Sequence, residues 1–234
     1  MKLTFLTCAN ATHLSSQQKI QNEISFIIKD DDLSHISFDE KHLNLDLEFV
    51  NSDFYQNHKE IAQSKKGAGF CIWKPYFLQK LLNQASDGDI VIYVDSTDSI
   101  TSDTVKFIID YLIKNDTFIL AWHQNKSKNK ILVSTKRECL IKMNCDNDKY
   151  KNAQMIEAGF LVAVASKTTK EIIDEWLNFC CEKECIVDDI MTDVANYPEY
   201  KFNRYDQSVL SVLFEKHKLT KLQRIPGIRF NVRG

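Results

Sequence analysis

Proline and glycine are scarce in this chain, with three prolines and six glycines among 234 residues, which argues against a long disordered region. Disordered segments are typically poor in apolar residues, whereas 44% of this chain is hydrophobic. We find no internal repeat and no low-complexity stretch, which argues against solenoid and fibrous proteins. The length and composition instead predict a single globular domain that spans residues 1–234.

An excess of charge of one sign is also missing. The 30 basic and 32 acidic residues give a formal net charge of −2 at pH 7. Proteins that bind nucleic acid through a basic field carry more positive charge than this. We therefore expect no nucleic-acid partner.

Long apolar runs are absent as well. No run approaches the roughly 18 residues that would span a bilayer, so we expect no transmembrane segment. The N-terminal stretch MKLTFLTCANATHLSS lacks the long apolar core and the cleavage site of a signal peptide. We therefore expect a cytoplasmic protein, and peripheral association with the inner face of the membrane stays open.

Cysteine pairs with the spacing of a metal site are missing too. The chain has seven cysteines, none of them in a CxxC arrangement. Cys180 and Cys181 are adjacent, which is poor geometry for a disulfide bond. We interpret the cysteines as reduced thiols of a cytosolic protein. A zinc site formed by Cys180, Cys181 and Cys185 is the alternative.

Apolar runs alternate with segments of helical periodicity along the chain. We expect strands at residues 3–6, 24–30, 45–51, 89–95, 117–123, 130–134 and 159–165. We expect helices at residues 15–24, 74–85, 102–115, 135–144, 166–183 and 204–219. This alternation predicts an α/β fold with an open, mainly parallel sheet and helices on both faces. Such sheets bind ligands beyond the carboxyl ends of their strands.

One of these strand ends carries two acids. In GDIVIYVDSTD, an apolar run from Asp89 leads to Asp95, and Asp98 follows three residues later. Two carboxylates on a short turn can share Mg²⁺ or Mn²⁺, which prefer oxygen ligands. Such a cation can offset the charge of a diphosphate leaving group. The alternative is a polar turn in which Asp98 caps local structure.

Four segments resemble one protein family. IVIYVDSTDSI resembles the DxD region of GT-A glycosyltransferases, although Thr97 stands where the second aspartate is usual. Three further blocks resemble a group of GT-A-type enzymes of bacterial and viral polysaccharide synthesis, and Asn203 and Tyr205 replace two usual histidines. These blocks are KKGAGFCIWKPYFLQKLL, the stretch from STKRECL to EWLNFC, and NYPEYKFNRYDQSVLSVLFEKH. The resemblance covers roughly residues 65–219.

The resemblance implies a GT-A-like, Rossmann-like fold and a glycosyltransferase of the hexosyl- or deoxyhexosyltransferase class. Such an enzyme moves a sugar from a nucleotide-sugar to a hydroxyl of a glycan or lipid-linked glycan. The products would be polysaccharide, O-antigen, capsule or glycoprotein glycans. Asp95 and Asp98 together, or Asp95 alone, would hold Mn²⁺ or Mg²⁺; an enzyme that works without a metal is the third reading.

Five residues are candidates for binding the nucleotide-sugar. Thr7, Cys8 and Ala9 end the first strand, where main-chain groups would meet the nucleotide. Lys74 and Lys136 lie near helix N-termini, where added positive charge would bind an anion such as the diphosphate. The alternatives are a surface lysine beside a core tryptophan for Lys74 and a solvated face for Lys136.

Two carboxylates are candidates for facing the acceptor. Asp206 opens the last helix and could act as general base on the attacking hydroxyl, or simply cap the helix. Glu157 precedes an apolar strand and could accept hydrogen bonds from sugar hydroxyls, or form a strand-entry turn.

Two other functional classes stay open. A nucleotide-sugar-binding module without turnover fits the altered acidic motif and the missing histidines. A metal-dependent nucleotidyl- or phosphotransferase is the second, but the chain lacks a glycine-rich phosphate loop of the usual spacing.

Overall fold

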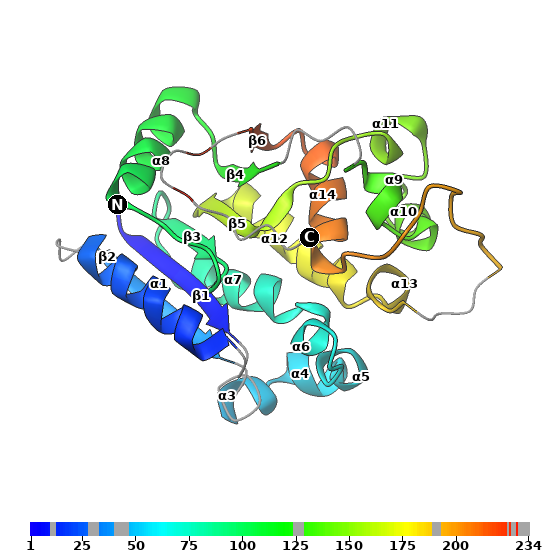
Figure 1. Cartoon of the computed structure of the whole chain (residues 1–234), viewed down its shortest axis with the longest axis horizontal. Coiled ribbons are helices and arrows are strands. Elements are labelled where there is room, and N and C mark those ends of the chain that lie inside the picture. Colours follow the sequence, from blue (N-terminus) through cyan, green and yellow to red (C-terminus); the bar gives the residue numbers. More distant parts are fainter. Residues whose placement is uncertain are drawn as a thin grey trace.

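A computed structural model describes residues 1–9, 13–27, 33–39, 47–123, 129–188, 193–223, 225 and 228. Its centre is a six-stranded sheet in the order β2-β1-β3-β5-β4-β6 (Figure 1). The strands are β1 (Leu3–Ala9), β2 (Leu33–Asp39), β3 (Ile90–Val94), β4 (Ile119–Trp122), β5 (Glu157–Val164) and β6 (Thr220–Leu222). β1 pairs in parallel with β2 and β3, β4 pairs in parallel with β6, and β5 is antiparallel to both β3 and β4. The expected mixed, mainly parallel sheet is confirmed.

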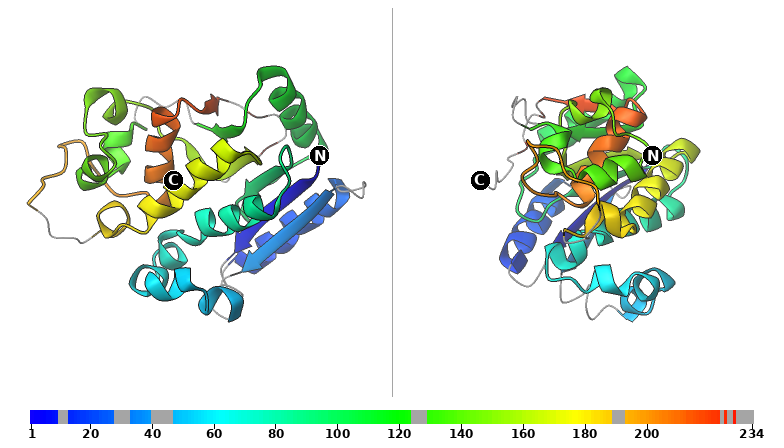
Figure 2. Two further views of the ribbon diagram at one scale, coloured as in Figure 1. Left: turned by 180° about the vertical axis from the view of Figure 1, so that it is seen from behind. Right: turned by 90° about the vertical axis from the view of Figure 1, so that its right-hand side faces the viewer.

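Helices cover both faces of the sheet. The side chains of Ile90, Ile92 and Val94 belong to an apolar cluster with α1 (Leu14–Ile27) and α8 (Ser102–Asn115). Val91 and Tyr93 belong to a second cluster with α7 (Trp73–Gln84), α12 (Lys167–Cys180) and α14 (Asp206–Lys216). Figure 2 shows α7 and α12 side by side on this second face. Because both faces of β3 are covered, its sequence is uniformly apolar.

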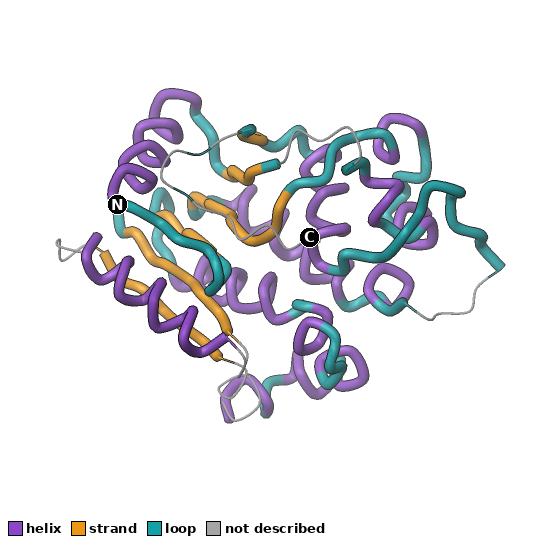
Figure 3. The backbone as a smooth tube through the Cα atoms, in the orientation of Figure 1, coloured by secondary structure: helices purple, strands orange, loops and turns teal. Residues whose placement is uncertain are grey.

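Short helices occupy the connections. They are α3 (Leu47–Val50), α4 (Asp53–Asn57), α5 (Lys59–Ala62), α6 (Gly67–Phe70), α9 (Ile131–Ser134), α10 (Arg137–Lys142), α11 (Asp148–Lys151) and α13 (Lys183–Ile186). Figure 3 shows the strands gathered in one half of the molecule, with α9, α10, α11 and α13 in the other half.

Three expected strands are helical where the structure describes them. Residues 24–27 belong to α1, because Ile20 and Ile24 are one helical turn apart and both are fully buried against the sheet. Residues 47–50 form α3 and residues 131–134 form α9. A short apolar run fits a buried helical turn as well as it fits a strand. The remaining residues of the first two segments, 28–30 and 45–46, lie outside the described part.

Two strands of the sheet have no counterpart among the expected ones. β2 follows the alternating sequence LSHISFD and pairs only with β1, so it forms one edge of the sheet. β6 has three residues and forms the other edge beside β4. Edge strands need less apolar sequence than central ones, which weakens their signal.

Two further findings concern the membrane and the thiols. Within the described residues, no helix has both the length and the apolar character that crossing a bilayer requires. All seven cysteines are free thiols, and five of them are buried. Cys180, Cys181 and Cys185 do not gather into a metal-binding group in this part of the chain.

Candidate active site

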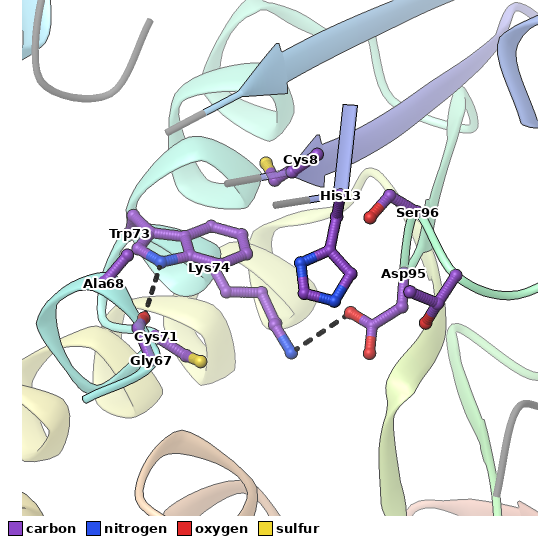
Figure 4. Close-up of a pocket in the computed structure, with 11 residues that line it drawn as sticks. Cys8, His13, Gly67, Ala68, Cys71, Trp73, Lys74, Asp95 and Ser96 are labelled. Carbon is purple, nitrogen blue, oxygen red and sulfur yellow. Dashed lines mark hydrogen bonds and ion pairs between the residues drawn. The ribbon is translucent and has the colours of Figure 1, made fainter. Parts of the chain in front are cut away.

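A pocket lies beyond the carboxyl ends of β1 and β3 (Figure 4). Its lining comes from the end of β1 with Cys8 and Ala9, and from the turn after β3 with Asp95, Ser96 and Thr97. The rest of the lining is contributed by His13, Gly67, Ala68, Cys71, Trp73 and Lys74. This is the position that open α/β sheets use for ligands.

The acids after β3 converge on a glycine of the neighbouring strand. The Asp95 amide donates to the Gly159 carbonyl at 2.7 Å, and the Asp98 amide donates to the Asp95 carbonyl at 2.9 Å. A Cβ atom on Gly159 would lie 3.0 Å from Asp95 Oδ2 and 3.1 Å from Asp98 Oδ2. The two carboxylates therefore face the same small space, and the absent side chain of Gly159 keeps that space open.

This arrangement fits a hard divalent cation. Mg²⁺ and Mn²⁺ take oxygen ligands, and Mg²⁺ commonly binds through one or two carboxylates with water and substrate phosphates. Among the residues that the structure describes, no group of three or more His, Cys, Asp or Glu side chains could hold a metal. A cation above Gly159 would thus use Asp95 and Asp98 and leave positions for water and phosphate.

Lys74 is the buried cation at the centre of the site. Its Nζ donates to the Ala158 carbonyl at 3.1 Å and lies 3.3 Å from Asp206 Oδ2 and 3.6 Å from Asp95 Oδ1. The amine also lies 4.8 Å from the centroid of the Tyr93 ring. Burial acts to lower the pKa of Lys74, but the carboxylates of Asp206 and Asp95 outweigh it and the pKa is raised. The amine is therefore protonated at neutral pH.

Asp206 is the buried partner of Lys74. Asp206 is 4% exposed, and burial raises the pKa of its carboxyl to about 6. The Asp95 carboxylate also acts to raise this pKa, while Lys74 acts to lower it. The Asp206 carbonyl accepts a hydrogen bond from Trp176 Nε1 at 2.9 Å. Asp206 is thus held between α12 and Lys74, and it contacts the pocket through Lys74 rather than lining it.

Asp95 is more exposed than its buried partners. Its side chain is 39% exposed, and its Oδ1 accepts a hydrogen bond from the Tyr93 hydroxyl. Because Oδ1 faces Lys74 and Tyr93 while Oδ2 faces Gly159, the two oxygens of this carboxylate have separate roles. Figure 4 shows the His13 ring and the Lys74 amine both directed toward Asp95.

One wall of the pocket has a left-handed backbone. Residues 67–71 all have positive φ, between 48° and 89°. Ala68, Phe70 and Cys71 bear side chains, and each pays about 1–2 kcal/mol for this conformation. The segment is fixed by Trp73, whose Nε1 donates to the carbonyl of residue 67 at 3.2 Å. Strained backbone of this kind concentrates at functional sites.

A second pocket opens beside the first one. It is lined by Asn129, Val133, Ser134, Met155, Glu157, Lys201, Phe202, Arg204 and Gln207. Glu157 immediately precedes Ala158 and Gly159 of the first site, and Gln207 immediately follows Asp206. The two pockets are therefore neighbours across β5 and the start of α14.

The structure brings most of the predicted site residues together. Cys8, Ala9, Lys74 and Asp95 line the first pocket, and Asp98 shares the space above Gly159. Asp206 contacts Lys74. Glu157 lines the second pocket instead.

Four predicted residues line neither pocket: Asp98 and Asp206, whose contacts with the first site are given above, and Thr7 and Lys136. The side chain of Thr7 is fully buried beneath the end of β1. Lys136 is 3% exposed; its Nζ donates to the Val187 carbonyl at 2.8 Å and pairs with Glu138 at 2.7 Å. Contact of Thr7 or Lys136 with a ligand stays a prediction, and the burial of both side chains argues against it.

Sequence reasoning did not single out His13, and it included residues 67–71 only as part of a block that resembles the family. His13 belongs to the stretch that follows β1, where the ligand side of such sheets lies, so its position was the available signal. Ala68 and Cys71 stand between and after the glycines of KKGAGFC, and no propensity rule predicts positive φ for them.

Comparison with known proteins identifies the fold. No protein-family model matches the chain, and no curated protein matches it. A structure of the bifunctional glycosyltransferase WbbM matches with a TM-score of 0.56 and 11% identity, over 94% of this chain and 38% of that chain. The chain thus spans well under half the length of WbbM. This likeness gives the chain a GT-A-like α/β fold, as the sequence predicted.

Other glycosyltransferase structures match at lower similarity. Galactosyltransferase LgtC in complex with donor and acceptor sugar analogues has a TM-score of 0.47 and 14% identity, over 93% of this chain and 72% of that chain. Mouse xyloside xylosyltransferase 1 has a TM-score of 0.48 and 9% identity, over 95% of this chain and 84% of that chain.

Proposed function

We propose that this protein is a glycosyltransferase that moves a sugar from a nucleotide-sugar to a hydroxyl group of an acceptor glycan. The observation that carries the proposal is the convergence of the Asp95 and Asp98 carboxylates over Gly159, at the carboxyl end of β3 and beside a pocket. The GT-A-like fold supports it, because open α/β sheets bind their ligands at this edge.

The donor occupies the first pocket in this proposal. Main-chain groups of Cys8 and Ala9 meet the nucleotide, and the diphosphate lies toward Asp95 and Asp98. Mn²⁺ or Mg²⁺ held by these two carboxylates would supply charge neutralisation for the departing nucleoside diphosphate. The donor sugar would be a hexose or deoxyhexose.

Lys74 and Asp206 keep the site in place. Lys74 joins three segments through Ala158, Asp95 and Asp206, so it fixes the Asp95 carboxylate relative to β5. Because Lys74 and Asp206 are both buried, the geometry of this cluster is set before the donor arrives, which favours catalysis by preorganisation.

Glu157 is the better placed of the two acceptor-facing candidates. A general base must come within hydrogen-bond reach of the attacking hydroxyl. Glu157 lines the second pocket and is partly exposed, whereas the Asp206 side chain is 5% exposed and ion-paired. We therefore assign the acceptor side to Glu157 and a positioning role to Asp206.

The cellular setting belongs to the same proposal. A cytoplasmic enzyme, working freely or at the inner face of the membrane, would extend a glycan or lipid-linked glycan. Its products would serve polysaccharide, O-antigen, capsule or glycoprotein glycan synthesis.

A thermal-shift screen tests the proposal. Nucleoside diphosphates and nucleotide-sugars with different bases are each added with and without Mn²⁺. One base series should raise the Tm in a Mn²⁺-dependent manner, because a ligand that binds only the folded state stabilises it. Asp95→Asn should abolish the Mn²⁺-dependent part of the shift, while Asp110→Asn on the exposed face of α8 should retain it.

A metal-dependent shift that survives in Asp95→Asn would contradict the assignment. Release of nucleoside diphosphate from the donor that binds then separates a transferase from a binding module without turnover. Binding without release in the presence of glycan acceptors would favour the module.

A further inference from the structure

The second pocket carries more positive than negative charge. Lys201 and Arg204 lie on its rim and Glu157 is its one carboxylate among the lining residues. Within the described part of the chain, neither cation forms an ion pair with a carboxylate. The Arg204 guanidinium has a 3.5 Å contact from Nη1 to Gln207 Oε1, which is long for a hydrogen bond. Both side chains are therefore available to an anion.

The main chain holds these two cations at the pocket. The Lys201 amide donates to the Val133 carbonyl at 2.9 Å, and the Arg204 amide donates to the Ser134 carbonyl at 3.2 Å. The segment that bears them is thus fastened to α9, across the pocket. A fixed backbone lowers the entropy lost when the side chains bind a ligand.

An exposed aromatic residue follows Lys201 in the chain and packs against Arg204. Phe202 is 48% exposed and lines the same pocket. The guanidinium carbon of Arg204 lies 5.3 Å from the centroid of the Phe202 ring. An apolar ring face beside a planar cation suits a ligand that presents a C–H-rich surface and an anionic group together, as an acidic sugar does.

A residue with a strained backbone lies between Arg204 of the second pocket and Asp206 of the first site. Tyr205 has φ 53° and ψ −120°, a conformation that residues with side chains rarely adopt. This turn lets Arg204 line the second pocket while Asp206, two residues later, contacts Lys74 in the first. The strained conformation of Tyr205 directs Arg204 and Asp206 to different sites, and strain of this kind concentrates at functional sites.

We propose that the second pocket binds an anionic group on the acceptor glycan, through Arg204 and Lys201 with Phe202 against the sugar ring. This inference rests on the proposed function, because it names the acceptor of that reaction. Arg204 can bind a carboxylate or a phosphate with two parallel hydrogen bonds, so an acidic sugar and a phosphorylated sugar share the chemistry.

Binding of four disaccharides by calorimetry tests this inference. One ends in glucuronic acid, one in its methyl ester, one in glucose and one in glucose 6-phosphate. The wild type should bind at least one anionic probe about tenfold tighter than the neutral probes, as expected for a charge-assisted hydrogen bond. Preference for the carboxylate identifies an acidic sugar as the source, and preference for the phosphate identifies a phosphorylated one.

Variants connect the preference to these residues. Arg204→Gln should remove most of the preference and Lys201→Gln part of it, whereas Lys106→Gln on the exposed face of α8 should leave it unchanged. Phe202→Ala should weaken acid and ester alike, because the ring contacts the sugar rather than its charge. Glu157→Gln should strengthen anion binding, because it removes the like charge in the pocket.

Three results would overturn the inference. The first is binding of all four probes with affinities within about twofold of one another, and the second is no binding of either anionic probe. The third is a preference that survives in Arg204→Gln with an unchanged Tm. Because the probes are tested without donor or metal, a lost preference beside intact Mn²⁺-dependent nucleotide binding removes this inference alone. An anion preference without any nucleotide binding removes the proposed function, and with it the acceptor role, and leaves only a pocket that binds anionic sugars.

Discussion

At the scale of single residues, the site depends on a lysine placed between two aspartates. Lys74 is 5% exposed, and a buried charged amine is destabilising unless charged groups lie close to it. Asp206 and Asp95 supply them, and Asp206 has its carboxyl pKa raised to about 6 by burial. This pair therefore connects the chemistry of the site to the stability of the fold.

Asp206→Asn should change how stability depends on pH. The Asp206 carboxyl has a pKa of about 6 in the folded chain, against an ordinary value of 3.8. Between these values the folded state binds more protons than the unfolded state, so the wild type loses stability as pH rises through this range. The free energy of unfolding of Asp206→Asn minus that of the wild type should therefore rise by about 2–3 kcal/mol as the pH increases from about 4 to about 7, measured with urea.

Asp110→Asn on the exposed face of α8 is the matched control, and its stability should follow the wild type at every pH. Parallel curves for Asp206→Asn and the wild type would show that the folded carboxyl titrates normally, which the buried geometry does not allow.

Gly159→Ala tests whether the two carboxylates work as a pair. The new Cβ would lie 3.0 Å and 3.1 Å from one oxygen of Asp95 and one of Asp98, so both carboxylates must shift. We expect the fold to persist, because the side chain of Asp95 is partly exposed and can move. Displaced ligands should weaken Mn²⁺ binding by about tenfold or more, measured by titration of nucleotide-bound protein. Unchanged Mn²⁺ affinity would mean that the cation binds elsewhere.

At the scale of elements, the left-handed segment 67–71 forms one wall of the donor pocket. Gly69 has φ 89°, and a Cβ there would lie 2.7 Å from the Ala62 carbonyl oxygen. The wall is thus pressed against the end of α5, and a glycine is required both by the backbone conformation and by the close approach. Local propensity gives no hint of this contact, since Ala62 is seven residues earlier in the chain.

Gly69→Ala should destabilise the protein more than Gly88→Ala. The two glycines have φ of 89° and 87°, but a Cβ on Gly88 meets nothing within 4 Å. The unfavourable φ destabilises both variants, and the clash destabilises only Gly69→Ala. The difference in free energy of unfolding should be about 1–3 kcal/mol in chemical denaturation. Equal decreases in the free energy of unfolding of the two variants would show that segment 67–71 accommodates the added Cβ without destabilisation.

The central elements could be predicted from the sequence, and the peripheral ones could not. β3 and β5 are continuous apolar runs, and α7, α8, α12 and α14 have clear helical periodicity. The strand expected at residues 130–134 is the helix α9, because four apolar and small residues satisfy either structure. β2 was missed because its alternation of apolar and polar residues is that of an edge strand.

At the scale of the whole molecule, the site is assembled from segments far apart in the sequence. Cys8, Lys74, Asp95 and Asp206 meet at one end of the sheet, beside Gly159 of the antiparallel strand. The sequence identified these residues singly, through strand ends and helix starts. It did not place Lys74 between the aspartates, and it did not separate Glu157 into a second pocket. Those facts depend on strand order and helix packing, which no local pattern contains.

The same topology explains why two lysines of similar sequence context differ. Lys74 and Lys136 both stand at the start of a helix. α7 packs beneath the carboxyl end of β3, so Lys74 enters the site, whereas α10 packs on α13 and Lys136 binds a main-chain carbonyl there. A helix N-terminus is therefore a weak predictor of a ligand until the sheet is known.

Anomalous diffraction at the manganese edge shows directly whether Asp95 and Asp98 bind the cation. Crystals are soaked with MnCl₂ and with the nucleoside diphosphate that gives the largest thermal shift. We predict a single strong peak within coordination distance of Asp95 and Asp98, above Gly159, with the diphosphate on its open side. A nucleotide bound in the pocket with its manganese peak away from both carboxylates would contradict it.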